Sequence, residues 1–143
     1  MAIVVYAGAL VAVTVAVHAG GLSAALGLFS RPLPTPLGTR FWPTAWLLVR
    51  ATWFLLLIHL VEIAVWALFY WWKDCLPDAE SAFYFSGVTY ATVGYGDLVL
   101  QKPWRMLAPV EGLVGILMCG LSAGLFFALV SRIFASRLQG QPK

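Results

Sequence analysis

The sequence of 143 residues predicts an all-α membrane protein with three membrane-spanning helices and one short helix that enters the membrane only part-way. Hydrophobic residues make up 62% of the chain and charged residues 10%, and the mean hydropathy is +0.87. A soluble domain carries about 25% charged residues, so this composition excludes a soluble protein. Three apolar stretches also exceed the roughly 20 residues that a helix needs to cross the hydrocarbon core.

Residues 1–30 predict the first span, because only Thr14, His18 and Ser23 interrupt the apolar run of residues 2–29. A cleaved signal peptide is the alternative, but the run lacks a basic start and is longer than a signal core. Small residues that favour close helix packing recur at every fourth position: Gly8, Ala12, Ala16, Gly20 and Ala24. We interpret His18 as a hydrogen-bonded structural residue rather than a sensor.

Residues 31–44 predict a cytoplasmic loop that ends in an interfacial segment. The stretch is rich in proline and glycine, which favour turns over helix. Its basic residues, Arg31 and Arg40, are typical of the cytoplasmic side of a membrane. Pro43 is suited to the start of the following helix.

Residues 45–72 predict the second span, which ends in aromatic residues typical of a membrane interface. His59 and Glu62 lie inside this span, three positions apart and therefore on one face of the helix. Ionisable groups in a span are costly and seldom face lipid, so we expect both side chains to face protein.

An acidic loop follows, and Asp78 or Glu80 in it favours the start of the next helix. That helix, residues 79–91, is too short to span the membrane and is predicted to enter it part-way. Residues 104–134 predict the third span, and residues 135–143 a short cytoplasmic tail.

The distribution of charge predicts the topology of the chain. Six of the nine basic residues fall on the proposed cytoplasmic side: Arg31, Arg40, Arg50, Arg132, Arg137 and Lys143. Four of the six acidic residues fall on the outer side: Asp74, Asp78, Glu80 and Asp97. Because basic residues are retained in the cytoplasm, we expect the N-terminus outside and the C-terminus inside.

The segment Thr92-Val93-Gly94-Tyr95-Gly96-Asp97 follows the short helix directly. Glycine reaches backbone angles closed to other residues, and here it stands at alternate positions. Such an extended segment can turn successive carbonyls toward one side, where four copies around an axis would replace the water shell of a cation. A glycine-rich turn between two helices is the alternative interpretation.

The run from Ser81 to Asp97 resembles the pore helix and TVGYG selectivity filter of potassium channels. Residues 45–134 resemble the two-helix pore unit of bacterial potassium channels as a whole. In these terms 45–72 is the outer helix, 79–91 the pore helix, 92–97 the filter and 104–134 the inner helix, and the first span is additional. One pore loop in each chain implies a homotetramer.

In this family the filter carbonyls and the threonine hydroxyl bind dehydrated potassium. The resemblance therefore implies K⁺ sites at Thr92, Val93, Gly94 and Tyr95, and a structural role for Gly96. Potassium enters as the permeant ion, and no cofactor is implied. The implied partners are further copies of the chain, potassium ions and membrane lipid, but no nucleic acid.

The supports of the filter depart from the family pattern. The aspartate after the filter is usually held by an aromatic donor on the pore helix. Here Asp97 takes the place of that aspartate, and Tyr84 or Phe85 occupies the aromatic region, of which only Tyr84 can donate. Some channels place a glutamate behind the filter, where this sequence has Val88, so that support is missing.

Three ionisable residues have no simple match in the family: His59, Glu62 and Glu111. We hypothesise that they form one buried polar cluster that supports the filter in place of the missing glutamate. The alternatives are three separate groups, each satisfied by backbone or water, and a proton-sensing role for the cluster.

Gly115 or Gly120 lies where the family places a gating hinge in the inner helix, although glycine in a membrane helix also serves packing alone.

Cys75 and Cys119 are not expected to form an intrachain disulfide, since Cys119 lies within an apolar run. A free Cys75 and a Cys75 bridge between subunits both remain open.

These features together predict a potassium-selective channel in a bacterial inner membrane that conducts passively. A weakly selective cation channel and a non-conducting assembly or sensor subunit are the alternatives. No helix carries arginine at every third position, so a voltage sensor is not expected. The sequence shows no nucleophile and base pair, so we do not expect an enzyme.

Overall fold

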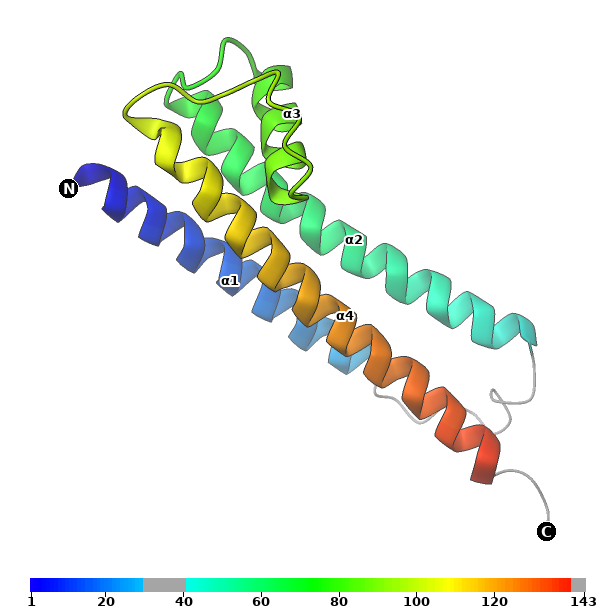
Figure 1. Ribbon diagram of the computed structural model, residues 1–143. Coiled ribbons are helices and arrows are strands. Elements are labelled where there is room, and N and C mark those ends of the chain that lie inside the picture. The colour runs from blue at the N-terminus through cyan, green and yellow to red at the C-terminus, as the bar shows by residue number, and fades with distance from the viewer. Residues whose placement is uncertain (30–40, 140–143) are drawn as a thin grey trace.

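The computed structural model describes residues 1–29 and 41–139, and every regular element in these two ranges is a helix (Figure 1). The elements in chain order are α1 (Ala2–Phe29), α2 (Phe41–Trp72), α3 (Ala79–Tyr90), the 3₁₀ turn η2 (Trp104–Met106) and α4 (Leu107–Gln139). The loop expected at residues 31–40, with Arg31 and Arg40, lies outside the described residues, as does the end of the tail after residue 139.

Three of the helical stretches are long and apolar enough to cross a membrane: Ala2–Leu28, Phe41–Trp72 and Trp104–Ala135. Their mean hydropathies are 2.2, 2.0 and 2.4. The protein is therefore an all-α, multi-pass integral membrane protein, while α3 is a short helix of 12 residues.

The observed helix bounds differ from the expected bounds by four residues or more at two places. The second helix begins at Phe41 rather than at residue 45, because Pro43 fits in its first turn, where no backbone N–H has a helical partner. The last helix continues to Gln139 and so takes in part of the segment 135–143 that was expected as tail.

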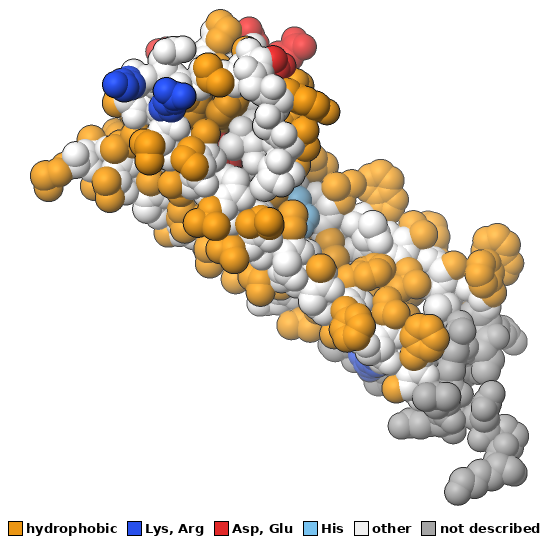
Figure 2. Space-filling view, viewed as in Figure 1, with side chains coloured by type: hydrophobic (Ala, Val, Ile, Leu, Met, Phe, Trp, Pro, Cys, Tyr) orange, Lys and Arg blue, Asp and Glu red, His pale blue; other side chains and the backbone are white. Residues whose placement is uncertain are grey.

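The long helices form a bundle in which α2 runs antiparallel to α1 and α4 (Figure 1). The N-terminus lies at the end of the bundle that holds α3, and the C-terminus lies at the opposite end. In the view of Figure 2, hydrophobic side chains cover the length of the bundle, and exposed acidic side chains gather at the α3 end.

The largest hydrophobic core lies at the α3 end and joins all four helices. Its buried members are Leu10, Trp66, Phe69, Tyr70, Leu76, Ala82, Phe85, Leu100 and Leu107. Trp66 of α2 is fully buried, and its indole Nε1 donates to the hydroxyl of Thr14 on α1 at 2.9 Å. This core fixes α3 against the spans.

α3 begins at a side-chain cap. The carboxylate of Asp78 accepts from the backbone N–H of Ser81 at 2.7 Å and from its hydroxyl at 3.1 Å. Glu80 adds negative charge in the first turn, where the positive end of the helix dipole lies. Both acidic residues that were expected to favour the start of this helix therefore stand in position to do so.

The face that α1 packs against its neighbours is not the stripe of small residues. Gly8 and Gly20 of that stripe have nothing within 4 Å of an added Cβ, and the whole stripe is exposed in the single chain. The buried face carries larger polar and apolar residues, among them Thr14 and His18. Gly21 makes the close approach instead, since its Cβ would lie 2.6 Å from Cδ1 of Ile58.

α4 approaches the end of α3 most closely at Gly115. A Cβ at this position would collide with the backbone carbonyl oxygen of Tyr90. At Gly120 nothing lies within 4 Å of an added Cβ. The geometry therefore gives Gly115 a packing role against α3, and a gating hinge at either glycine stays a prediction.

We expect Gly115→Ala to lower the free energy of unfolding by about 1–3 kcal/mol, because the new methyl group has to displace rigid backbone. Gly120→Ala is the matched control on the same helix and should leave stability unchanged. Thermal unfolding of both variants in detergent measures the difference. Equal stability of the two variants would contradict the close approach.

Candidate functional site

The segment that follows α3 is hydrogen-bonded through its backbone to the carbonyls in the last turn of that helix. The backbone N–H groups of Val93 and Gly94 both donate to the carbonyl of Val88, at 2.8 and 3.1 Å. These bonds satisfy carbonyls that a helix end leaves without partners. Val88 therefore contributes to the segment through its backbone, although its side chain cannot replace a glutamate.

The backbone of this segment takes positive φ at alternate positions. The φ angles are 58° at Thr92, 52° at Gly94 and 80° at Gly96. The intervening residues, Val93 and Tyr95, are not among the residues with positive φ. Glycine accepts this conformation without cost, whereas threonine there stores about 1–3 kcal/mol of strain. The sequence gives no signal for positive φ at Thr92.

All residues of Thr92–Asp97 are exposed in the single chain. The exposed fraction is 50% for Val93 and 72% for Tyr95. The apolar and aromatic side chains are unfavourable against water, and the irregular backbone that carries them is unfavourable against lipid, which cannot satisfy its polar groups. A single chain therefore does not bury this segment, although its apolar side chains and irregular backbone favour burial against protein.

Tyr84 forms a hydrogen bond with the C-terminal residue of the segment, Asp97. Its hydroxyl donates to Oδ2 of Asp97 at 2.8 Å. This hydrogen bond lowers the pKa of Asp97 and raises the pKa of Tyr84, because it favours the carboxylate and the phenol. Phe85 is instead buried in the core, with its ring centroid 5.4 Å from that of Tyr70.

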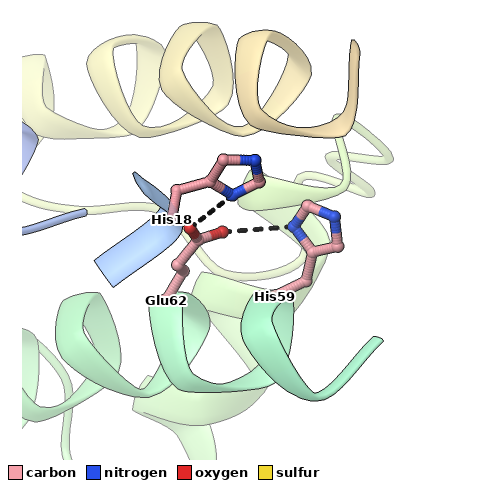
Figure 3. Close-up of side chains that lie close together, drawn as sticks. All are labelled: His18, His59 and Glu62. Atoms are coloured by element: carbon pink, nitrogen blue, oxygen red, sulfur yellow. Dashed lines mark hydrogen bonds and ion pairs between the residues drawn. The ribbon is translucent and has the colours of Figure 1, made fainter. Parts of the chain in front are cut away.

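A first buried carboxylate, Glu62 of α2, receives hydrogen bonds from three helices, and Figure 3 shows the two that involve histidines. Nδ1 of His18 on α1 lies 2.8 Å from Oε1, and Nδ1 of His59 on α2 lies 3.1 Å from Oε2. The hydroxyl of Tyr90 at the end of α3 also donates to Oε2. Glu62 is fully buried, so this network ties α1 and α2 to the start of the exposed segment.

A second buried carboxylate, Glu111 of α4, has a separate set of partners. The hydroxyl of Tyr70 donates to its Oε2 at 2.7 Å, and Oγ of Ser86 lies 2.5 Å from its Oε1. Oγ of Ser86 also lies 2.9 Å from the carbonyl oxygen of Ile63. Glu111 is fully buried as well, so this network ties α4 and α2 to the middle of α3.

The three residues expected to form one cluster thus divide between two networks. His59 and Glu62 lie together, whereas Glu111 shares none of their hydrogen bonds. The reason lies on α3, where Ser86 and Tyr90 are four residues apart and so lie on the same face. The Ser86 hydroxyl is hydrogen-bonded to Glu111, and the Tyr90 hydroxyl is hydrogen-bonded to Glu62.

Four partners of the carboxylates were not identified from the sequence: His18, Tyr70, Ser86 and Tyr90. Tyr70 belongs to the aromatic residues that the sequence pattern assigns to the membrane interface. His18 is interpreted from the sequence as a hydrogen-bonded structural residue, but its partner is not named. The spacing of Ser86 and Tyr90 was a usable signal, because two hydroxyls on one face of an otherwise apolar helix require partners. To pair His18 with Glu62, one has to know how far α1 and α2 are shifted along each other, and the hydrophobic periodicity of the sequence does not give this register.

Both cysteines are free, so the chain has no intrachain disulfide. Burial and the neighbouring charge of Asp74 raise the pKa of Cys75 to about 11, so its thiol is protonated at neutral pH. A Cys75 bridge between subunits stays a prediction.

The hydrogen bonds around Ser86 indicate that Glu111 is protonated. Ser86 has one hydroxyl proton, which it cannot donate to both the Ile63 carbonyl and Glu111. If the Glu111 carboxyl is protonated, it donates to Oγ of Ser86, and the Ser86 hydroxyl donates to the Ile63 carbonyl, so every group has a partner. Glutamine has the same shape and supplies that donor, with one further N–H left over, so we expect Glu111→Gln to lower the free energy of unfolding by only about 1 kcal/mol.

Glu62→Gln is the matched comparison, and we expect it to cost about 1–3 kcal/mol. Its amide has one acceptor oxygen in place of the two that serve His18, His59 and Tyr90. Thermal unfolding in detergent compares the two variants. A larger loss for Glu111→Gln than for Glu62→Gln would contradict the assignment.

We expect Tyr84→Phe to raise the pKa of Asp97 toward its ordinary value, because the bond that favours the carboxylate is lost. The stabilisation from this bond is present above the ordinary carboxyl pKa and is lost as pH falls through the lowered value. Titration of the labelled Asp97 carboxyl by NMR measures the change. Tyr6→Phe is the control and should leave the titration unchanged.

Residues 54–132 match a protein family described as ion channel. The match covers α3, the exposed segment, α4 to Arg132 and most of α2. No curated protein and no solved structure gave a significant match.

The family match spans more than half of the chain and confirms the resemblance to potassium-channel pore domains. The family is one of channels and not of enzymes, as the sequence led us to expect. The chain is therefore a member of this ion channel family, and the matched domain takes in α2 from residue 54, α3, and α4 as far as Arg132.

Proposed function

We propose that four copies of the chain form a potassium-selective channel that conducts K⁺ passively. In this proposal the carbonyls of Thr92, Val93, Gly94 and Tyr95, with the Thr92 hydroxyl, replace the hydration shell of the ion. The observation that carries it is the alternation of positive φ through the segment at Thr92, Gly94 and Gly96. This alternation favours successive carbonyls that face one side.

The exposure of the segment supports a tetramer. Irregular backbone at membrane depth is tolerated only where protein buries it or where it lines a water-filled path. One chain leaves Val93 and Tyr95 exposed, so neighbouring copies are needed to cover them. The exposed apolar side chains of α4, such as Leu113 and Leu117, continue the uncovered surface.

The direction of α3 supports conduction of a cation. The segment begins at the C-terminal end of α3, where the negative end of the helix dipole lies. A dehydrated cation near that end is stabilised, and an anion is not. The same geometry is compatible with a channel that discriminates weakly among monovalent cations, so selectivity has to be measured.

The hydrogen bonds around α3 support a rigid filter. Glu111 holds Ser86 in the middle of α3, Glu62 holds Tyr90 at its end, and Tyr84 holds Asp97. Ion binding sites made of carbonyls require ligand positions that keep their geometry. In this proposal the two carboxylates take over the support that a glutamate at position 88 gives in other channels.

We further propose that the N-terminus faces the outside of a bacterial inner membrane. The acidic residues lie in α3 or in the segments flanking it, at the end that also holds the N-terminus (Figure 1): Asp74, Asp78, Glu80 and Asp97. Arg132 lies toward the opposite end of α4, in keeping with the retention of basic residues in the cytoplasm.

Flux from purified protein in liposomes tests the proposal. We expect rapid K⁺ flux and far slower Na⁺ flux under matched gradients, and a tetramer in cross-linking of the same samples. Equal K⁺ and Na⁺ flux would favour the weakly selective cation channel. A folded tetramer without any flux would favour a non-conducting assembly or sensor subunit.

We expect Gly94→Ala to abolish K⁺ flux or to reduce it at least tenfold. The added methyl group at a φ of 52° strains the backbone by about 1–2 kcal/mol and turns the adjoining carbonyls. Gly20→Ala is the control, since Gly20 is helical and nothing lies within 4 Å of its Cβ. Unchanged flux in the Gly94 variant would contradict the assignment of the filter.

A further inference from the structure

We propose that His18, His59 and Glu62 bind one divalent transition-metal ion of the chemistry of Zn²⁺. This inference goes beyond ion conduction, because the site lies behind α3 between the helices of one chain and not in the exposed segment (Figure 3). It concerns an ion that stays bound rather than one that permeates.

The distances among the donor atoms suit a small metal ion. One ligand atom from each residue lies within 4.8 Å of the other two. The Nδ1 atoms of His18 and His59 lie 2.8 and 3.1 Å from the carboxylate oxygens of Glu62. Zinc with bonds of about 2.0–2.1 Å holds tetrahedral ligands about 3.3 Å apart, so small shifts convert these hydrogen bonds into metal bonds.

The chemistry of the donors also suits zinc. Two imidazoles and one carboxylate form one of the ligand sets that bind Zn²⁺ in proteins. The hydroxyl of Tyr90 lies 3.0 Å from Nδ1 of His59, next to the position that a fourth ligand would take. Tyr90 or a water molecule can therefore complete a tetrahedron.

The charge of the site favours a cation. Glu62 is fully buried, and its ion-pair partners among the described residues are two histidines, which carry charge only when protonated. A carboxylate at membrane depth with neutral partners is costly. A divalent ion compensates this charge and uses the two imidazoles in their neutral form.

The burial of His18 leaves one ring nitrogen to act as a ligand. Its side chain is 1% exposed, and its Nε2 has no hydrogen-bond partner among the described residues. Nδ1 is the nitrogen that faces Glu62, at 2.8 Å from Oε1. In this proposal the metal bond therefore forms at Nδ1, and Nε2 takes no part in it.

The site borders an open groove on one side. His59 lines this groove of about 350 Å³ between α2 and α4, which also reaches Ser122. The His59 side chain is therefore 15% exposed in the single chain, whereas Glu62 is fully buried. Once bound, the ion would fix α1 to α2 and, through Tyr90, to the base of the exposed segment.

Metal binding to the purified full-length protein tests the proposal. We expect one Zn²⁺ for each chain by equilibrium dialysis with elemental analysis, and at least about a tenfold loss of affinity in His18→Ala and in His59→Ala. Thr14→Ala is the matched control. It removes the buried hydrogen bond between α1 and Trp66 without touching the three ligands, and it should keep zinc affinity.

Co²⁺ in place of Zn²⁺ reports the ligand type through its visible absorption. We expect ligand-field bands without a thiolate charge-transfer band in the wild type, which shows that Cys75 and Cys119 are not ligands. His18→Cys should add that band. This variant tests whether His18 is a ligand even if the alanine variants do not fold. Co²⁺ that binds to His18→Cys without producing the thiolate band would overturn the proposal.

Three further results would overturn the proposal: no stoichiometric zinc in the wild type, unchanged affinity in both histidine variants, or an equal loss in Thr14→Ala. All these measurements concern binding, so a protein that conducts no potassium can still bind zinc. Failure of the metal site and failure of the proposed function are therefore distinguishable.

Discussion

Polar groups that lie at membrane depth have to find their partners within the protein, and this constraint governs the whole structure. α3 ends inside the bundle, so its last carbonyls and its hydroxyl side chains cannot rely on water. The carbonyl of Val88 accepts two backbone N–H groups from the following segment. Ser86 and Tyr90 meet the carboxylates of Glu111 and Glu62. The position of the segment Thr92–Asp97 follows from these bonds and from the core around them.

The additional first helix takes part in this support. Thr14 accepts a hydrogen bond from Trp66, and His18 meets Glu62, so α1 contacts the pore unit through polar groups as well as through Leu10 in the core. Polar contacts between membrane helices fix register, because lipid offers no alternative partner. α1 thus acts as a structural part of the pore unit rather than as an independent anchor.

The two buried carboxylates illustrate different uses of one functional group. Glu111 forms a closed network in which every donor and acceptor is satisfied by hydroxyls and one carbonyl. Glu62 faces two histidines, one of which keeps an unpaired nitrogen. Hydrogen bonding explains the first site completely and the second only in part, and this difference distinguishes a structural site from one that can hold a ligand.

Hydrophobic run length, glycine spacing and charge distribution are local properties, and they determined the three spans, the short helix and the segment Thr92–Asp97 from the sequence alone. The resemblance to potassium channels pointed to Tyr84 as the partner of Asp97, because only one aromatic side chain in the matching region can donate. The tertiary structure decided which helix faces meet. It paired His18 with Glu62, separated Glu111 from that pair and gave Gly115 rather than Gly120 the contact with Tyr90. The physical reason is that nearly uniform apolar surfaces leave rotation and register of a helix undetermined, so that long-range packing of side chains has to fix them.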